Sequence, residues 1–324
     1  MAQALLKLSA LKSAPKLQKN DLIVVPFTLS KGAKKPTALV SADLPEESLA
    51  DFKGKFGEVL IVYVHGARTA LLGLGDPDKL DDEKVRVAYG ILVGKARTLQ
   101  VKRILLYSAD LVSSEAALEG ALLASYTFEG YQSEKGPLHL SEVVWVGENG
   151  PSKNDLSRLY ALAHGVFLAR DLTNHNADDV TPQHLVHIAR TLAKKYSAVK
   201  TTIFDKKRLE KEKFGLLLAV SRGAHVEPAL IIASYKGNPK SKEHTVVVGK
   251  GVTYDTGGLN LKTNMLTMKG DMAGAAACLG LLTAAAEAKL KANFTIVIPS
   301  TENSIGERSY KPGDVYKSYL GKTV

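Results

Sequence analysis

Residues 246–280 join two apolar runs through a short charged loop. The first run ends in Gly249-Lys250-Gly251, and the second, residues 272–286, is rich in alanine and has the length of a buried helix. The residues between them carry Asp255, Lys262 and Asp271 and are predicted to form an irregular loop. This order of strand, loop and helix is the repeating unit of α/β folds, in which ligands bind where strand ends meet helix starts.

The charged residues of this stretch are suited to hydrolytic chemistry. Lys250 follows a run expected in the interior of a sheet, where an ammonium group lowers its pKa or finds a partner. Asp255 and Asp271 offer the hard oxygen ligands that Zn²⁺, Mn²⁺ or Mg²⁺ accepts, and Lys262 could stabilise an oxyanion. Each residue also has a structural interpretation. Asp271 could be a helix N-cap, Asp255 a turn residue and Lys250 a surface lysine.

The exact residue sequence of the stretch favours the metal-site interpretation. GKGVTYDTGGLNLK followed by MKGDMAGAA resembles the signature of the leucine aminopeptidase (cytosol aminopeptidase) family of two-metal exopeptidases. The resemblance implies that Lys250, Asp255 and Asp271 are metal ligands in a site for two divalent ions, manganese or zinc, with magnesium also possible. It implies that Lys262 is a catalytic residue that polarises the scissile carbonyl.

Further matches extend the resemblance from about residue 165 to the end. They include Ala-Arg-Asp-Leu-Thr-Asn at 169–174 and Tyr-Lys-Pro-Gly-Asp-Val at 310–315. By resemblance, the function is removal of N-terminal amino acids from peptides, with leucine-like side chains preferred. The family commonly forms hexamers, so a homo-oligomer is expected as well.

One family motif is absent. In the family, Asn-Thr-Asp-Ala-Glu-Gly-Arg soon follows a Gly-Lys-Thr turn and supplies the remaining acidic ligands, whereas this sequence has Gly321-Lys322-Thr323 and ends at Val324. Three side chains cannot saturate two ions held about 3.5–4 Å apart. We therefore expect a C-terminally truncated catalytic domain, with weak or absent activity in this chain alone. The alternative is a non-catalytic family member that acts as a subunit-interaction or DNA-binding module.

The chain is predicted to form two α/β domains, each with a mixed or mainly parallel sheet flanked by helices. Its 324 residues suit two domains, and the turn-rich sequence Gly-Glu-Asn-Gly-Pro-Ser at 147–152 places the boundary between 1–150 and 151–324. By resemblance, the first domain assists assembly and shapes access to the site, and the second is the incomplete catalytic domain. The predicted strands span residues 22–27, 59–64, 69–74, 103–107, 143–146, 199–204, 229–234, 244–248 and 294–299. The predicted helices span residues 82–98, 113–128, 153–172, 182–196, 206–212, 214–221 and 271–289.

Composition indicates a cytoplasmic protein. No apolar run reaches the roughly 18 residues of a membrane span, and the basic N-terminus lacks the apolar core of a secretory signal. The one cysteine, Cys278, fits a reducing compartment and is expected to be a packing residue. The formal net charge of +10 suits a polyanionic partner, but no nucleic-acid-binding motif is present and only short lysine clusters occur, at 31–35 and 206–213. Nucleic acid is therefore a minor alternative partner.

Overall fold

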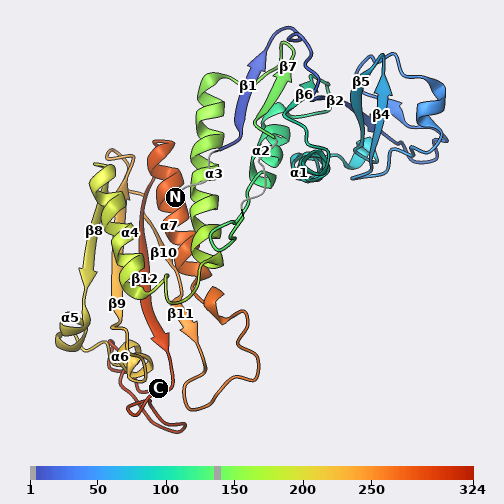
Figure 1. Cartoon of the computed structure of the whole chain (residues 1–324). Coiled ribbons are helices and arrows are strands. Elements are labelled where there is room, and N and C mark those ends of the chain that lie inside the picture. The colour runs from blue at the N-terminus through green and yellow to red at the C-terminus, as the bar shows by residue number, and fades with distance from the viewer. Residues whose placement is uncertain (1–4, 135–139) are drawn as a thin grey trace. The chain divides into compact units, whose positions relative to one another are not determined.

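A computed structural model describes residues 5–134 and 140–324, and Figure 1 shows the course of the chain. The chain divides into two compact units, Met1–Ala163 and His164–Val324. The division falls within helix α3 (Lys153–Asn174), whereas the sequence places the domain boundary just before that helix. Ser152 starts this helix as expected, because its hydroxyl accepts the Asp155 N–H while its own N–H donates to the Asp155 carboxylate. In the described part of the chain, no helix is long and apolar enough to cross a membrane.

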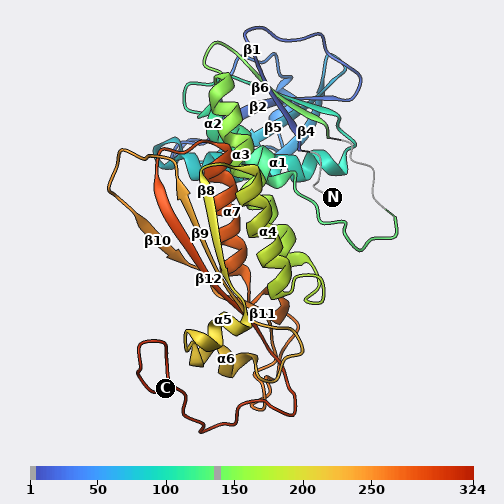
Figure 2. The same ribbon diagram turned by 90° about the vertical axis from the view of Figure 1, so that its left-hand side faces the viewer.

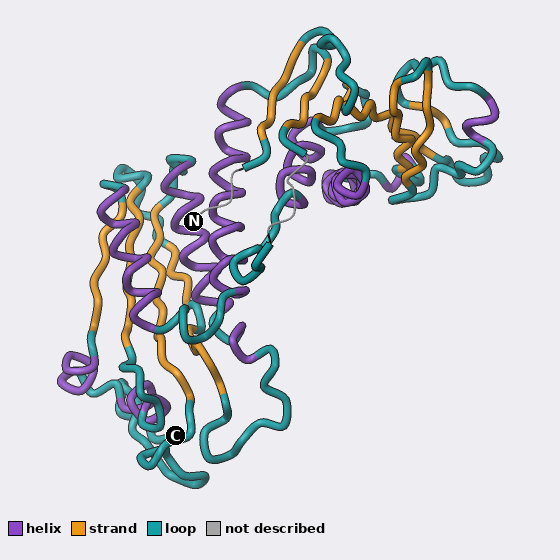
Figure 3. The backbone as a smooth tube through the Cα atoms, in the orientation of Figure 1, coloured by secondary structure: helices purple, strands orange, loops and turns teal. Residues whose placement is uncertain are grey.

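The first unit is a mixed sheet with helices, as predicted. Its described strands follow the order β1-β7-β6-β2-β5-β4, with β3 beside β2, and Figure 3 shows them as orange segments. The pairs of β2 with β5 and β6, and of β7 with β1 and β6, are parallel, whereas β4 pairs antiparallel with β5. The elements are β1 (Lys7–Leu11), β2 (Asp21–Thr28), β3 (Thr37–Ala38), η1 (Glu46–Leu49), β4 (Val59–Val64), β5 (Ala67–Gly73), η2 (Pro77–Lys79), α1 (Asp82–Thr98), β6 (Arg103–Tyr107), α2 (Ser114–Ala124) and β7 (Glu142–Val146).

Alternating side chains of these strands face two separate cores. Leu22 and Val24 of β2 belong to the main core, which includes Tyr89 and Leu92 of α1. Val25 and Phe27 of the same strand pack in a smaller cluster. The sequence did not predict β1, because residues 7–11 read as part of a basic, amphipathic terminus. The strand forms because its backbone pairs with β7 and Leu8 is buried in the main core, and the exposed ion pair of 2.8 Å between Lys7 and Glu142 adds little.

The second unit has a mixed sheet in the order β10-β12-β9-β8, with β11 also paired to β12. Strands β10 and β11 run parallel to β12, and β9 runs antiparallel to both β12 and β8. Figure 2 shows α4 and α7 on the same side of this sheet, where they share one core with β9 and β12. The elements are α4 (Pro182–Lys195), β8 (Val199–Phe204), α5 (Lys206–Lys211), α6 (Gly215–Ser221), β9 (Ala229–Lys236), β10 (Thr245–Val248), β11 (Gly251–Asp255), η3 (Met268–Gly270), α7 (Ala273–Glu287) and β12 (Asn293–Asn303).

The stretch from 246 onward differs from the prediction in two ways. Residues 251–255, expected in an irregular loop, form strand β11, because β12 is long enough to pair first with β10 and then with β11. The run before Lys250 was expected in the sheet interior. It forms the edge strand β10 instead, and Val246 and Val248 are 59% and 69% exposed.

Helices α3 and α7 approach each other closely at two glycines. A Cβ atom at Gly280 would lie 2.5 Å from the carbonyl oxygen of Gly165, and one at Gly165 would lie 2.4 Å from the carbonyl oxygen of Gly280. Neither oxygen can move away without displacing its helix. The small residues of α7 thus allow the backbones to touch, and they fix the helix that begins beside Asp271.

Gly280→Ala is expected to destabilise the protein by about 1–3 kcal/mol, because overpacking outweighs the gain of about 1 kcal/mol in helix propensity. Gly94→Ala is the matched control, since Gly94 lies in α1 and a Cβ there meets no atom within 4 Å. That change should stabilise by about 0.5–1 kcal/mol. Thermal and urea unfolding measure both variants, and shifts of the same sign would contradict the packing argument.

A polar cluster joins the ends of α4 and α7 to the middle of α3. The carboxylate of Glu287 accepts a hydrogen bond of 2.7 Å from the Tyr196 hydroxyl and one of 3.1 Å from Nζ of Lys195, and it lies 2.6 Å from Nδ1 of His164. The side chain of His164 is 46% exposed. Burial raises the pKa of Glu287, but the bonds from Tyr196, His164 and Lys195 outweigh burial and lower it overall.

Glu287→Gln is expected to lower the stability at neutral pH by about 1–2 kcal/mol, because charge-assisted bonds become neutral ones. Since the folded-state pKa of Glu287 is lowered from its ordinary value of 4.5, its contribution is present above about pH 4.5 and is lost as the pH falls through the folded value. Unfolding between pH 7 and pH 3 should therefore show the wild-type advantage over Glu287→Gln shrinking with acidification. An advantage independent of pH would contradict this account.

Candidate functional site

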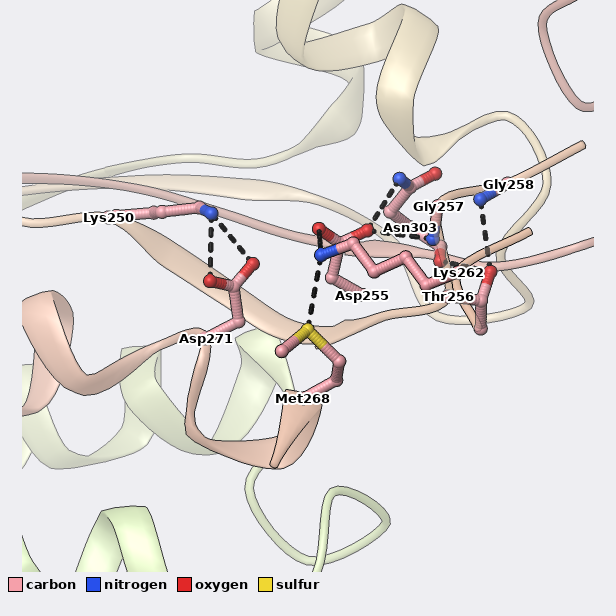
Figure 4. A network of polar contacts seen from close by, with 9 residues as sticks. All are labelled: Lys250, Asp255, Thr256, Gly257, Gly258, Lys262, Met268, Asp271 and Asn303. Atoms are coloured by element: carbon pink, nitrogen blue, oxygen red, sulfur yellow. Dashed lines mark hydrogen bonds and ion pairs between the residues drawn. The ribbon is translucent and has the colours of Figure 1, made fainter. Parts of the chain in front are cut away.

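The four residues singled out from the sequence gather at the ends of β10 and β11. Lys250 lies between these two strands, and Asp255 is the last residue of β11. Lys262 lies in the loop that follows, and Asp271 lies between η3 and α7. Figure 4 shows their side chains as two neighbouring ion pairs, so the fold brings all four together.

Lys250 and Asp271 form the first pair. Nζ of Lys250 donates to Oδ1 of Asp271 at 2.8 Å and lies 2.7 Å from Oδ2, which is buried and has no hydrogen bond. The start of α7 is pressed against this position, since Ala275 N–H donates to the Lys250 carbonyl. A Cβ atom at Gly274 would lie 2.8 Å from the Lys250 nitrogen, so only glycine fits there. The backbone therefore holds Lys250 beside Asp271.

Two sequence interpretations of this pair change. The Lys250 side chain was expected to be buried, but it is 59% exposed. Its ammonium group has a charged partner, Asp271, which was the second of the two expected outcomes. The N-cap interpretation of Asp271 is wrong. Met272 occupies the cap position without a side-chain hydrogen bond, and α7 starts at Ala273. The carboxylate of Asp271 is thus not used by the helix and faces the site.

Lys262 and Asp255 form the second pair, with Nζ 2.6 Å from Oδ2. Burial raises the pKa of Asp255, but the bonds from Lys262, the Gly257 N–H and Asn303 outweigh it and lower the pKa overall. The hydrogen bond to Asp255 raises the pKa of Lys262, and the charge of Asp271 adds to this effect. Both residues of the pair are therefore charged at neutral pH. Lys262 also lies 3.1 Å from Sδ of Met268.

Asn303 is a site residue that the sequence analysis did not single out. Its Nδ2 donates to Oδ1 of Asp255 at 2.7 Å, and its carbonyl accepts from the Thr256 hydroxyl at 2.8 Å. The signal that could have found it is its place at the end of β12, beside the end of β11 in a parallel pair. Asn303 orients the Asp255 carboxylate and ties down the turn that follows.

The turn after Asp255 requires its two glycines. Gly257 and Gly258 have φ values of +86° and +66°, a region that favours glycine. The Gly257 N–H donates to Oδ1 of Asp255 at 3.0 Å, and the Lys262 N–H donates to the Thr256 carbonyl at 2.9 Å. The loop thereby returns Lys262 to the carboxylate seven residues earlier.

The chemistry of these donors fits a divalent cation. Asp255 and Asp271 are mostly buried, with side chains 13% and 19% exposed, and each carboxylate faces a cationic group. Two hard carboxylates and an amine are acceptable ligands for Mn²⁺ or Zn²⁺ once Lys250 loses its proton. No group of three or more His, Cys, Asp or Glu side chains suited to a metal occurs among the described residues. The donor set present here is thus smaller than two ions need.

Comparison with known sequences decides the family. A profile of the cytosol aminopeptidase family, catalytic domain, matches residues 167–324, and one of the same family's N-terminal domain matches residues 39–135. The chain belongs to the cytosol aminopeptidase family. The catalytic-domain match includes all four site residues.

Relatives and solved structures agree with this assignment. The probable cytosol aminopeptidase of Protochlamydia amoebophila is 45% identical over 95% of this chain, and that of Chlamydia felis is 41% identical over 96%. This chain spans 66% of the length of each relative. A mutant of tomato leucine aminopeptidase superposes with a TM-score of 0.81 at 26% identity, covering 98% of this chain and 67% of its own. The bottromycin maturation enzyme BotP in complex with Mn superposes with a TM-score of 0.78 at 26% identity, covering 94% and 64%.

Proposed function

We propose that this chain carries part of the active site of a metallo-aminopeptidase that removes N-terminal residues from peptides, with leucine-like residues preferred. The observation that carries the proposal is the convergence of Lys250, Asp255, Lys262 and Asp271 at the strand ends of a family catalytic domain. The expected protein is cytoplasmic and homo-oligomeric, a hexamer by family resemblance.

The proposed division of labour follows from the contacts. Lys250, Asp255 and Asp271 would hold divalent metal, manganese or zinc, with the remaining ligands supplied from outside the present donor set. Bound divalent ions supply Lewis-acid polarisation of a peptide carbonyl and of the attacking water. Asn303 and the Gly257 N–H keep the Asp255 carboxylate oriented, and the contact of α7 with Lys250 keeps Asp271 in place.

Lys262 is the proposed catalytic residue. Its ammonium group is held at the site by Asp255, and the raised pKa keeps it charged. A charged donor placed beside the scissile carbonyl stabilises the negative charge that develops on oxygen in the transition state. For this role Lys262 must exchange its bond to Asp255 for one to the substrate oxygen.

The test compares two proteins in the hydrolysis of leucine amide with Mn²⁺ or Zn²⁺. One is the 324-residue chain, in which we expect weak or absent activity. The other is the same chain fused to the part of the Protochlamydia amoebophila relative that has no counterpart here, in which we expect hydrolysis. A fusion that folds and binds Mn²⁺ but does not cleave leucine amide would overturn the proposal. It would favour a subunit-interaction or DNA-binding role instead.

A further inference from the structure

The central strand of the first unit, β2, lies at a topological switch point. Its neighbours are β5 on one side and, on the other, β6 along its first residues and β3 along its last, and the chain crosses from β5 to β6 through α1. Crevices outside the carboxyl ends of strands at such points are the usual ligand sites of open α/β sheets. Nothing in the aminopeptidase proposal uses this end of the sheet.

A cavity of about 530 Å³ opens between the segment that follows β2 and the segment that precedes β4. Leu29, the residue after β2, lines it together with Phe52, and four lysines surround it: Lys34, Lys35, Lys53 and Lys55. The volume is within the range of small-molecule sites, about 300–1,000 Å³. The cavity therefore joins an apolar wall to a concentration of positive charge.

Backbone contacts fix the two loops that carry the lysines. Residues 53–57 are tied to the end of β5, since Gly75 N–H donates to the Gly54 carbonyl and Gly57 N–H donates to the Gly73 carbonyl. The loop after β2 returns through β3, which pairs with the last residues of β2. The two loops are thus held on either side of the cavity rather than left as free tails.

Among the side chains that the structure describes, no carboxylate forms an ion pair with Nζ of Lys34, Lys35, Lys53 or Lys55. The carboxylate of Glu58 accepts hydrogen bonds from the backbone N–H groups of Lys53 and Lys55. The two segments that line the cavity, residues 29–36 and 49–58, carry five lysines, one aspartate and one glutamate, which is a formal charge of +3. Gathering like charges costs free energy that an anionic ligand would recover.

We propose that this cavity, the tetralysine pocket, binds a phosphorylated small molecule with an apolar or aromatic body, of which a nucleoside triphosphate is an example. Lysine is a point-charge binder of phosphate, and clustered phosphates match clustered ammonium groups. The partly exposed lining residues Leu29, Pro36 and Leu49 suit an organic body, and a concave site of this volume suits a small ligand better than a duplex.

The test is calorimetric titration of the full chain with ATP in low salt. A chelator is present, so that no phosphate is held through a metal in the second unit. Replacing Lys34, Lys35, Lys53 and Lys55 by Ala should weaken binding at least about tenfold. The matched control replaces Lys207, Lys240, Lys242 and Lys291 by Ala, because these four exposed lysines carry the same total charge and lie in the second unit. It should keep the wild-type affinity.

Two double variants test the loops separately, so that the result does not depend on the folding of the quadruple variant. K34A/K35A and K53A/K55A each change one loop, and each should weaken binding, whereas the corresponding arginine variants should retain it. Tripolyphosphate should displace ATP, and added salt should weaken both. Equal ATP binding by the tetralysine and control variants would overturn the proposal. Binding of a 20-base-pair DNA duplex without binding of ATP would also overturn it, because that outcome indicates a nucleic-acid surface.

Discussion

Asp271→Asn is expected to weaken Mn²⁺ binding by this chain at least about tenfold. Metal affinity depends on the charge of the ligand set, and even the loss of an outer-shell partner typically costs 10–100-fold. Asp271 is one of two carboxylates in the proposed set, and both of its oxygens face Nζ of Lys250, at 2.8 and 2.7 Å. An amide in this position removes a charge and leaves a much poorer ligand. Calorimetric titration with Mn²⁺ measures the change directly and needs no enzymatic activity.

Asp110→Asn is the control for this measurement. Asp110 is exposed and lies in the first unit, so the variant has the same change of net charge without a change at the site. The Asp271 variant should remain folded by circular dichroism, because an ion pair whose lysine is 59% exposed contributes only about 0–1 kcal/mol. Equal Mn²⁺ affinities of the wild type and the Asp271 variant would remove Asp271 from the proposed ligands.

The regular elements of both units follow closely from local sequence patterns. The prediction for α1 matches the structure at both ends, and β4, β6 and β8 also match. Cap residues explain part of this success: the Thr181 hydroxyl accepts the His184 N–H at the start of α4, and Pro182 occupies the first turn. Where the signal for an element lies within that element, the sequence is sufficient.

The differences arise where a distant segment decides the local structure. Residues 251–255 alternate Val252 and Tyr254 with polar residues, but the segment is short and lies between glycine-rich turn signals, which favour a loop. They are extended because β12 continues far enough to pair with them. The exposure of Val246 and Val248 has the same kind of cause, because an apolar run cannot reveal that its strand lies at the edge of a sheet.

The candidate site is likewise predictable only in part: its residues follow from local sequence, and their contacts depend on the fold. Lys250, Asp255, Lys262 and Asp271 were found from the order of residues within one stretch. Their pairing, Lys250 with Asp271 and Lys262 with Asp255, depends on the path of the loop and on the position of α7. Asn303 belongs to another strand, 48 positions from Asp255, and only sheet pairing brings it to that carboxylate.

Lys262→Ala is expected to reduce kcat for leucine amide by about 10²–10³ in the active fusion, the cost of removing one preorganised oxyanion donor. The affinity for Mn²⁺ should change little, because Lys262 is a partner of Asp255 and not a proposed ligand. Steady-state kinetics at saturating metal, together with Mn²⁺ titration of the same protein, measures both quantities. A fall in kcat without loss of metal separates transition-state stabilisation from metal retention.

Two further variants complete this test. Lys242→Ala removes an exposed lysine of the second unit and should leave kcat unchanged. Lys262→Arg keeps the charge but presents it as a planar fork, so it should recover only part of the lost activity. If Lys262→Ala instead lost Mn²⁺ and activity together, the main role of Lys262 would be to hold the Asp255 turn. The backbone bond from Lys262 to Thr256 makes that a real structural alternative. The kinetic and binding measurements must therefore be made on the same protein.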